Sequence, residues 1–178
     1  GDASPVDLTG VVDISCGFNA CVALKGDDTA VAWGLPTRGG LVPSSVTLTN
    51  VVDISCGGNV CVALKGDDTA YVWGDDSYGG LVPSSVTLTS VADISCGSNS
   101  CVARKTDNTG YAWGSSVYGG GDASSVDLTN VAEISCGIRA CVALKGDDTA
   151  VAWGDSNGGA GGAGDVSSVD LTNVAEIS

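Results

Sequence analysis

Short apolar runs alternate with turn residues along the chain, and the first forty residues show the pattern. Three runs rich in Val, Ile, Ala and Trp have the length of strands: residues 11–15, 20–25 and 29–33. Gly26-Asp27-Asp28, between the second and third runs, has the chemistry of a hairpin turn. The Gly-, Pro- and Ser-rich stretch 34–45 predicts a loop, and residues 46–48 are a candidate fourth strand. No window shows a 3.6-residue period, so we predict an all-β fold.

This pattern recurs every 40 residues. Tryptophans lie at positions 33, 73, 113 and 153, and cysteines lie at 16 and 21, 56 and 61, 96 and 101, and 136 and 141. Copies one, two and four share the string CVALKGDDTA, whereas the third reads CVARKTDNTG. A period of about 20 to 50 residues is typical of propellers and other repeat arrays, and three or four short antiparallel strands per unit fit a propeller blade.

The period also sets the boundaries of the units. We expect a linker with a partial first strand at 1–10, followed by repeats at 11–50, 51–90, 91–130 and 131–168, with a flexible Gly-rich loop at 158–164 and a partial fifth repeat at 169–178. Residues 169–178 copy residues 126–135 letter for letter. In a ring closed by strand exchange the two ends would complement each other, and here they are redundant. We therefore expect a propeller or propeller-like array that is either a segment of a longer repeat chain, which we favour, or an open unit whose terminal strand joins a neighbour.

Each pair of cysteines brackets a four-residue hairpin loop, as in Cys16 and Cys21. Opposed residues at such a loop base lie about 4.5–5.5 Å apart, a separation that a disulfide accepts. Local disulfides are thus predicted for all four pairs. Buried thiols, bridges between neighbouring repeats and zinc remain alternatives, although Cys-x4-Cys without His is an unusual zinc spacing. Disulfides would place the protein outside the cell or at its surface.

Charge and composition exclude several functions. The net charge of −14, from 21 acidic and 7 basic residues, argues against binding to nucleic acid or to an anionic membrane. No apolar run is long enough to form a membrane-spanning helix. The chain has no histidine, so no Ser-His-acid catalytic set and no metal triad can be assembled, and no Gly-rich phosphate loop is present. We therefore predict no enzyme and no catalytic, cofactor-binding or metal site. Paired carboxylates such as Asp27-Asp28 are the one feature that suits calcium, and turn formation explains them better.

The repeat resembles that of the regulator-of-chromosome-condensation family. Matching elements are Cys16-Gly17, Ala23-Leu24, Asp27, Trp33-Gly34 and, in the second copy, the stretch 75–81 (DDSYGGL). The resemblance implies a β-propeller, commonly of seven blades. The family's usual His is replaced by Ala20, Val60, Ser100 and Ala140, and paired cysteines make this chain a cysteine-rich variant. The family's nucleotide-exchange and β-lactamase-inhibitor activities do not carry over, because none of their binding residues can be matched.

The resemblance also implies that Trp33, Trp73, Trp113 and Trp153 pack one blade on the next, which we favour over sugar stacking. Loop residues are better candidates for contact surfaces: Phe18, Arg38, Tyr78, Tyr118 and Arg139. Four nearly uniform units predict a secreted structural protein that self-associates into a filament, coat or adhesive array. The alternative is a secreted binding module whose variable loops hold a protein or glycan partner.

Overall fold

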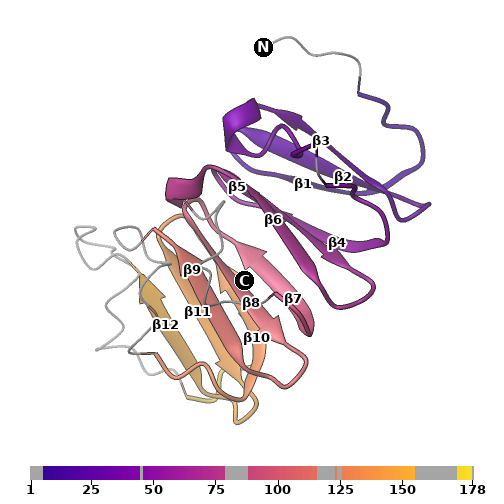
Figure 1. Cartoon of the computed structure of the whole chain (residues 1–178). Coiled ribbons are helices and arrows are strands. Elements are labelled where there is room, and N and C mark those ends of the chain that lie inside the picture. The colour runs from indigo at the N-terminus through magenta and orange to yellow at the C-terminus, as the bar shows by residue number, and fades with distance from the viewer. Residues whose placement is uncertain are drawn as a thin grey trace.

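The computed structural model describes residues 6–44, 46–78, 88–115, 123, 126–154 and 172–177. Within them the chain forms four antiparallel sheets of three strands each, one sheet per repeat (Figure 1). The sheets consist of β1 Val11–Cys16, β2 Ala20–Lys25 and β3 Ala30–Gly34; β4 Val51–Cys56, β5 Val60–Lys65 and β6 Ala70–Gly74; β7 Val91–Cys96, β8 Ser100–Lys105 and β9 Gly110–Gly114; and β10 Val131–Cys136, β11 Ala140–Lys145 and β12 Ala150–Gly154. The fold is all-β, and its four sheets are the blades of a partial propeller.

The structure departs from the sequence prediction after the third strand of a repeat. Residues 46–48 do not form a strand; the Leu48 carbonyl only accepts one hydrogen bond, of 3.0 Å, from the Ala30 amide. The predicted fourth strand is therefore wrong. Two short 3-10 helices, η1 Pro36–Arg38 and η2 Asp76–Tyr78, lie in loops that we expected to be irregular. In η1 the fixed φ angle of Pro36 favours the helical start.

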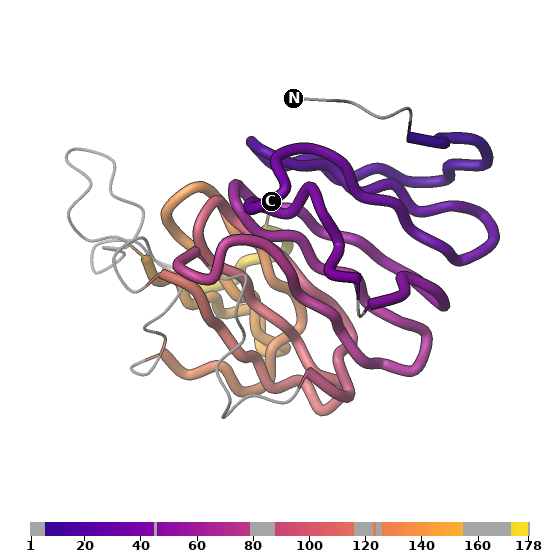
Figure 2. Tube along the Cα trace, turned by 45° about the horizontal axis from the view of Figure 1, so that its top comes forward, coloured from indigo at the N-terminus to yellow at the C-terminus, as the bar shows by residue number. Residues whose placement is uncertain are grey.

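The blades stack in chain order, and the core lies between them (Figure 2). The first strand of each repeat packs on the middle strand of the preceding repeat, so β4 contacts β2, β7 contacts β5 and β10 contacts β8. Between the first two blades, Val22 and Leu24 meet Ile54 and Trp73 in one buried cluster. Equivalent residues form the next two clusters. We call the side of a blade that carries Val22 or its equivalents the leading face, and the side that carries Ile54 or its equivalents the trailing face.

A column of glycines brings neighbouring blades into close approach. A Cβ atom on Gly17 would lie 1.5 Å from the Gly57 carbonyl oxygen, and one on Gly57 would lie 1.7 Å from that of Gly97. No side chain fits in such a space, which explains why glycine follows Cys16, Cys56 and Cys96. The contact sets the spacing of successive first strands.

Candidate functional site

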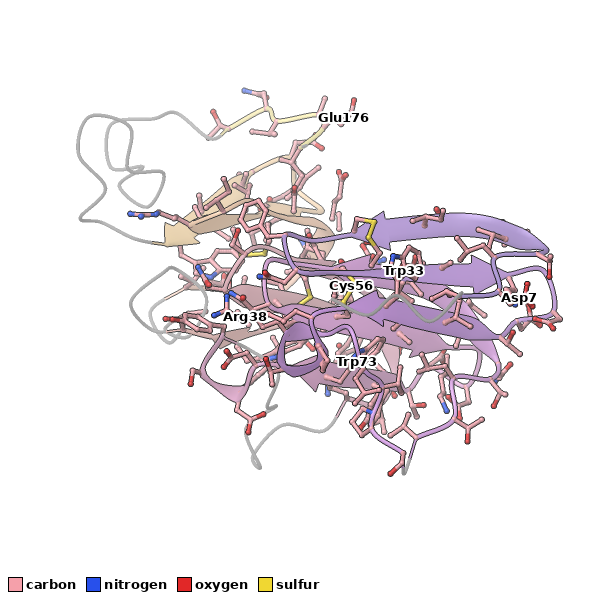
Figure 3. The ribbon with its side chains drawn as sticks, turned by 90° about the horizontal axis from the view of Figure 1, so that it is seen from above. Asp7, Trp33, Arg38, Cys56, Trp73 and Glu176 are labelled. Atoms are coloured by element: carbon pink, nitrogen blue, oxygen red, sulfur yellow. A yellow bond between two sulfur atoms is a disulfide. The ribbon has the colours of Figure 1, made fainter. Side chains whose placement is uncertain are left out.

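Four hairpin loops converge at one end of the blades, which we call the tip end. They comprise residues 17–19, 57–59, 97–99 and 137–139. In the first three repeats the loop after the third strand is tied to the same end, since the Leu35 amide donates to the Asn19 carbonyl at 2.7 Å, and Asp75 and Ser115 repeat this bond to Asn59 and Asn99. In Figure 3, Arg38 at the tip end and Asp7 lie at opposite ends of the sheets. The tip end therefore presents two sets of loops whose sequences vary between repeats.

A disulfide closes the base of every hairpin at the tip end. The four bonds join Cys16 to Cys21, Cys56 to Cys61, Cys96 to Cys101 and Cys136 to Cys141. The paired Cα atoms lie 4.1 Å apart, slightly closer than the spacing expected for opposed residues. No cysteine is left as a free thiol or as a bridge between repeats. In the chain-entropy model, closing so small a loop contributes roughly 2 kcal/mol per bond.

Asparagine side chains link the tips of successive repeats. Asn19 Nδ2 donates to the Gly58 carbonyl at 2.9 Å and to Asn59 Oδ1 at 3.0 Å. Asn59 Nδ2 in turn donates to Asn99 Oδ1 at 3.2 Å. The Arg38 guanidinium adds a hydrogen bond of 3.1 Å to Asn59 Oδ1, so it is held across the tip end. These asparagines were missed in the sequence, although a constant Asn before the second strand of three copies was a visible signal.

Serine side chains on successive first strands form a second column, directly before the first cysteine of each pair. The Cys56 amide donates to Ser15 Oγ at 2.9 Å, Cys96 donates to Ser55 at 3.2 Å, and Cys136 donates to Ser95 at 3.0 Å. Each serine thus satisfies a backbone donor of the next repeat. Together with the asparagines it fixes the register of one blade on another.

A shallow cavity of about 280 Å³ lies where the hairpins meet. Its lining includes the first cysteine of each disulfide, the column glycines, Phe18 and Ile138. Phe18 is 74% exposed and Ile138 is 61% exposed, so two large apolar side chains stand at its rim. The tip end therefore offers an apolar contact surface beside the polar asparagine and arginine side chains.

The structure places three of the other predicted loop residues in loops of the tip end. Arg38 and Tyr78 are half-buried in η1 and η2, and Arg139 is exposed on the fourth tip. Tyr118 and the Gly-rich loop 158–164 lie outside the described residues. The sequence did not single out Ile138, because its equivalents in the other hairpins are Phe18, Gly58 and Ser98.

The tryptophans lie between blades. Trp73, Trp113 and Trp153 are 2%, 1% and 5% exposed, and Trp73 Nε1 donates to the Gly39 carbonyl of the preceding repeat at 2.9 Å. The Tyr71 ring stacks beside Trp73 with centroids 6.0 Å apart. Trp33, on the trailing face of the first repeat, is only half-buried. These positions leave no buried tryptophan free to stack on a sugar.

The opposite end of the sheets, the turn end, is acidic. Asp27 Oδ1 accepts hydrogen bonds from the Thr29 hydroxyl at 2.6 Å and the Thr29 amide at 3.1 Å, and the same turn recurs at Asp67, Asp107 and Asp147. The hydroxyl bond, followed by the amide bond, lowers the pKa of Asp27. In the described part of the chain, no three His, Cys, Asp or Glu side chains gather as metal ligands. The first aspartate of each turn is engaged in turn formation.

Two lysines pair with aspartates near this end. Lys25 Nζ lies 3.1 Å from Asp7 Oδ2, and Lys145 lies 2.6 Å from Asp127. Each aspartate lies 18 residues before its lysine, ahead of the first strand of that repeat. The pKa of Asp7 is lowered to about 2, chiefly by hydrogen bonds from Thr9 and then by Lys25, and that of Asp127 is also lowered to about 2, chiefly by Lys145.

A row of carboxylates runs along the first strands, at Asp13, Asp53, Asp93 and Glu133. Burial raises the pKa of Asp53, and the negative charges of Asp93 and Asp13 add to the effect. The Asp53 carboxylate also accepts a 2.8 Å hydrogen bond from the Ile54 amide, and this bond partly opposes the rise in pKa. The row is thus a stack of like charges that the blade packing holds together.

Four consecutive three-stranded blades with a shared interface define the chain as a β-propeller repeat protein. The sequence profile of the "Regulator of chromosome condensation (RCC1) repeat" matches residues 11–39 and 51–79, which lie in the first two repeats, and each of these repeats carries a disulfide. No curated protein matches the sequence. No helix in the described residues is long and apolar enough to cross a membrane.

Solved structures share the fold. Human WBSCR16 is 21% identical with a TM-score of 0.60, over 81% of this chain and 47% of its own. Prp20p from Saccharomyces cerevisiae, described with its binding properties to Gsp1p and histones, is 17% identical with a TM-score of 0.62, over 84% and 47%. The ectodomain of the Physcomitrella patens receptor kinase CR4 is 18% identical with a TM-score of 0.60, over 81% and 40%. The chain spans less than half the length of these structures.

Proposed function

We propose that the chain is an extracellular protein-binding module that recognises its partner with the tip end of its blades. The observation that carries this proposal is the exposure of Phe18 and Ile138 at the rim of the cavity between the hairpins. Large apolar side chains on a surface that is otherwise polar are typical of interaction sites. Disulfides at the base of each hairpin restrict the loops, which reduces the entropy lost on binding.

The chemistry of the tip end favours a protein partner. Phe18 and Ile138 would enter apolar pockets of the partner, while Asn99 and the half-buried Arg38 provide polar groups on other loops of the same end. Loop sequences differ between repeats at this end, whereas the acidic turns of the opposite end recur almost unchanged. These features support a binding function, and the disulfides support an oxidising location outside the cell.

Site-specific photo-crosslinking tests the binding proposal. A benzoylphenylalanine in place of Phe18 or Ile138 is exposed to the extracellular proteins of the producing organism, and Val52, which is 53% exposed on β4, serves as the control position. We expect one discrete adduct from positions 18 and 138 and none from position 52. Excess unlabelled protein should suppress the adduct, and excess Phe18→Asp protein should not. Equal labelling from all three positions, or adducts that unlabelled protein does not suppress, would refute the proposal.

A second candidate function is self-association into an extracellular filament, coat or array. One observation favours it: Ile14 is 52% exposed, although its equivalents Ile54, Ile94 and Ile134 are buried between blades. None of the described residues covers this blade face, whose equivalents elsewhere bind another blade.

A further inference from the structure

The tip of the first repeat departs from the pattern of the repeats that follow it. A residue that recurs at the same position of every unit serves the shared scaffold, as the glycine and serine columns do here. Three side chains at this tip differ in chemistry from their equivalents in the second and third repeats: Phe18 corresponds to Gly58 and Ser98, Leu35 to Asp75 and Ser115, and Arg38 to Tyr78 and Tyr118. We call Phe18, Leu35 and Arg38 the first-tip patch.

Hydrogen bonds join the segments that carry this patch. The Leu35 amide donates to the Asn19 carbonyl at 2.7 Å, which ties Leu35 to the residue that follows Phe18. The Arg38 amide donates to the Leu35 carbonyl at 2.9 Å. Phe18 is 74% exposed and Leu35 is 46% exposed, whereas Arg38 is half-buried. The patch therefore combines two exposed apolar side chains with one partly covered cation.

The loop that carries Arg38 is held on the second repeat. Trp73 Nε1 donates to the Gly39 carbonyl at 2.9 Å, and a Cβ on Gly39 would lie only 3.0 Å from Cys61 Sγ. Arg38 Nη1 donates at 3.1 Å to the side-chain oxygen of Asn59, a residue that is 9% exposed. The contact between the first and second blades thus sets the position of the guanidinium, which lies at the tip end in Figure 3.

The guanidinium has hydrogen-bonding capacity that the described residues do not use. It carries five N–H donors, and in the described part of the chain its side chain makes the one bond to Asn59. Asp75 and Asp76 lie in the corresponding loop of the second repeat, yet among the described residues no acid forms an ion pair with Arg38. Lysines of the turn end differ in this respect, since Lys25 and Lys145 each pair with an aspartate.

We propose that the first-tip patch binds a partner protein through a carboxylate that the partner presents between apolar residues. The planar fork of Arg38 matches a carboxylate with two parallel hydrogen bonds, and Phe18 and Leu35 offer apolar contacts beside it. The bond to Asn59 already orients the guanidinium, so less side-chain entropy is lost on binding. The inference rests on the proposed binding function of the tip end and adds the chemistry of the partner.

The net charge of −14 does not exclude an acidic segment at this place. The acidic turns lie at the turn end, and strands of five or six residues separate them from the tips by about 17–20 Å. Charges in water are screened over about 8 Å at physiological ionic strength. These turns therefore contribute little to the potential at Arg38.

Selection from a phage library of random peptides, with the disulfide-intact chain as target, tests the proposal. We expect the enriched peptides to share an Asp or Glu between apolar residues. One enriched peptide is then synthesised in its acidic form and with the corresponding amide, Asn or Gln, and both forms are titrated by fluorescence anisotropy. The proteins compared are the unmodified chain, Arg38→Gln, Arg38→Lys and Phe18→Asp. Lys65→Gln is the matched control, because it removes the same charge from the turn end. Circular dichroism verifies that each variant is folded.

Arg38→Gln should weaken binding of the acidic peptide about tenfold or more, and Arg38→Lys should weaken it less, since lysine keeps the charge without the fork. Replacing the acid by its amide should weaken binding to the unmodified chain and leave binding to Arg38→Gln nearly unchanged, which is the coupling that a direct contact predicts. Lys65→Gln should bind like the unmodified chain.

Several results would overturn the inference: no enriched peptide, enriched peptides without a shared acid, no coupling between Arg38 and the acid, or an equal loss in Lys65→Gln. Peptides that bind Arg38→Gln normally but are lost in Phe18→Asp would overturn it and leave the binding function of the tip end intact. Peptides that neither substitution affects would contradict both proposals.

Discussion

Replacing Trp73 by alanine tests whether the tryptophans stabilise the chain through contacts between blades. Trp73 is 2% exposed, and its indole donates to the Gly39 carbonyl of the preceding repeat. Trp33 occupies the same position in the first repeat, where no preceding blade covers it among the described residues. Comparing the Trp73 and Trp33 substitutions therefore separates the stability that comes from the interface between blades from the stability that comes from within one blade.

The expected cost follows from the buried area. A tryptophan side chain buries about 150–250 Å², which at ~25 cal/mol per Å² corresponds to about 4–6 kcal/mol as an upper bound. Measured truncations of buried aromatic residues cost about 3–5 kcal/mol, and we expect this range for Trp73→Ala. For Trp33→Ala we expect roughly 1–2 kcal/mol, because part of the side chain is already exposed to water and no bond to a preceding repeat is present among the described residues.

Urea unfolding followed by far-ultraviolet circular dichroism measures both values, since a tryptophan substitution alters the fluorescence signal itself. Repeat proteins unfold with contributions from each unit and each interface, so the two curves are fitted to a nearest-neighbour scheme. Trp73→Ala should weaken the interface between the first two repeats and Trp33→Ala should not. If the two substitutions cost the same free energy of unfolding, the assignment of Trp73 to blade packing is wrong.

Three further predictions follow from other contacts. Gly57→Ala should lower the free energy of unfolding by about 1–3 kcal/mol, because its Cβ would overlap the Gly97 carbonyl. The control, Gly137→Ala, should have the same melting temperature as the unmodified chain. If Gly57→Ala leaves the stability unchanged, the close approach of the two backbones is wrong. Asp53→Asn should raise the melting temperature at pH 7. The pKa of Asp53 is higher in the folded than in the unfolded state, so the ionised carboxylate destabilises the fold above the folded-state pKa. The gain in melting temperature should vanish as the pH falls below the folded-state and unfolded-state pKa values. A gain that persists in acid, or an equal gain for the exposed Asp76→Asn, would argue against this cause. Replacing Cys56 and Cys61 together by serine should cost about 2 kcal/mol of free energy of unfolding in denaturant titrations without reductant, and no loss relative to the unmodified chain would show that the bridge does not stabilise the fold.

The strands and disulfides could be predicted from the sequence because their signals are local. Runs such as 11–15 and 20–25 specify strands by composition, and a hairpin of four residues brings Cys16 and Cys21 together wherever the repeat lies. The repeat family followed from motifs that also lie within one unit, such as Cys16-Gly17 and Trp33-Gly34. Local geometry decides all these features.

Contacts between repeats could not be predicted in the same way. The bond from Asn19 to Asn59 and the bond from Cys56 to Ser15 depend on how far one blade slides and rotates on the next, which the spacing of residues does not specify. The pairing of Lys25 illustrates the difficulty. The structure pairs Lys25 with Asp7, ahead of the first strand of its own repeat, and nothing in the sequence pattern distinguishes this acid from the many others. The choice between binding and self-association likewise depends on which faces are covered.

The columns of glycine, serine and asparagine have a consequence for the gene. Every contact in them joins a residue to one about 40 positions further on, so each unit carries both halves of the junction. Unequal recombination between segments that encode similar units would insert or delete a whole unit and regenerate the same junction on both sides. A single recombination event therefore changes the number of repeats in such an array and leaves the packing between its blades intact.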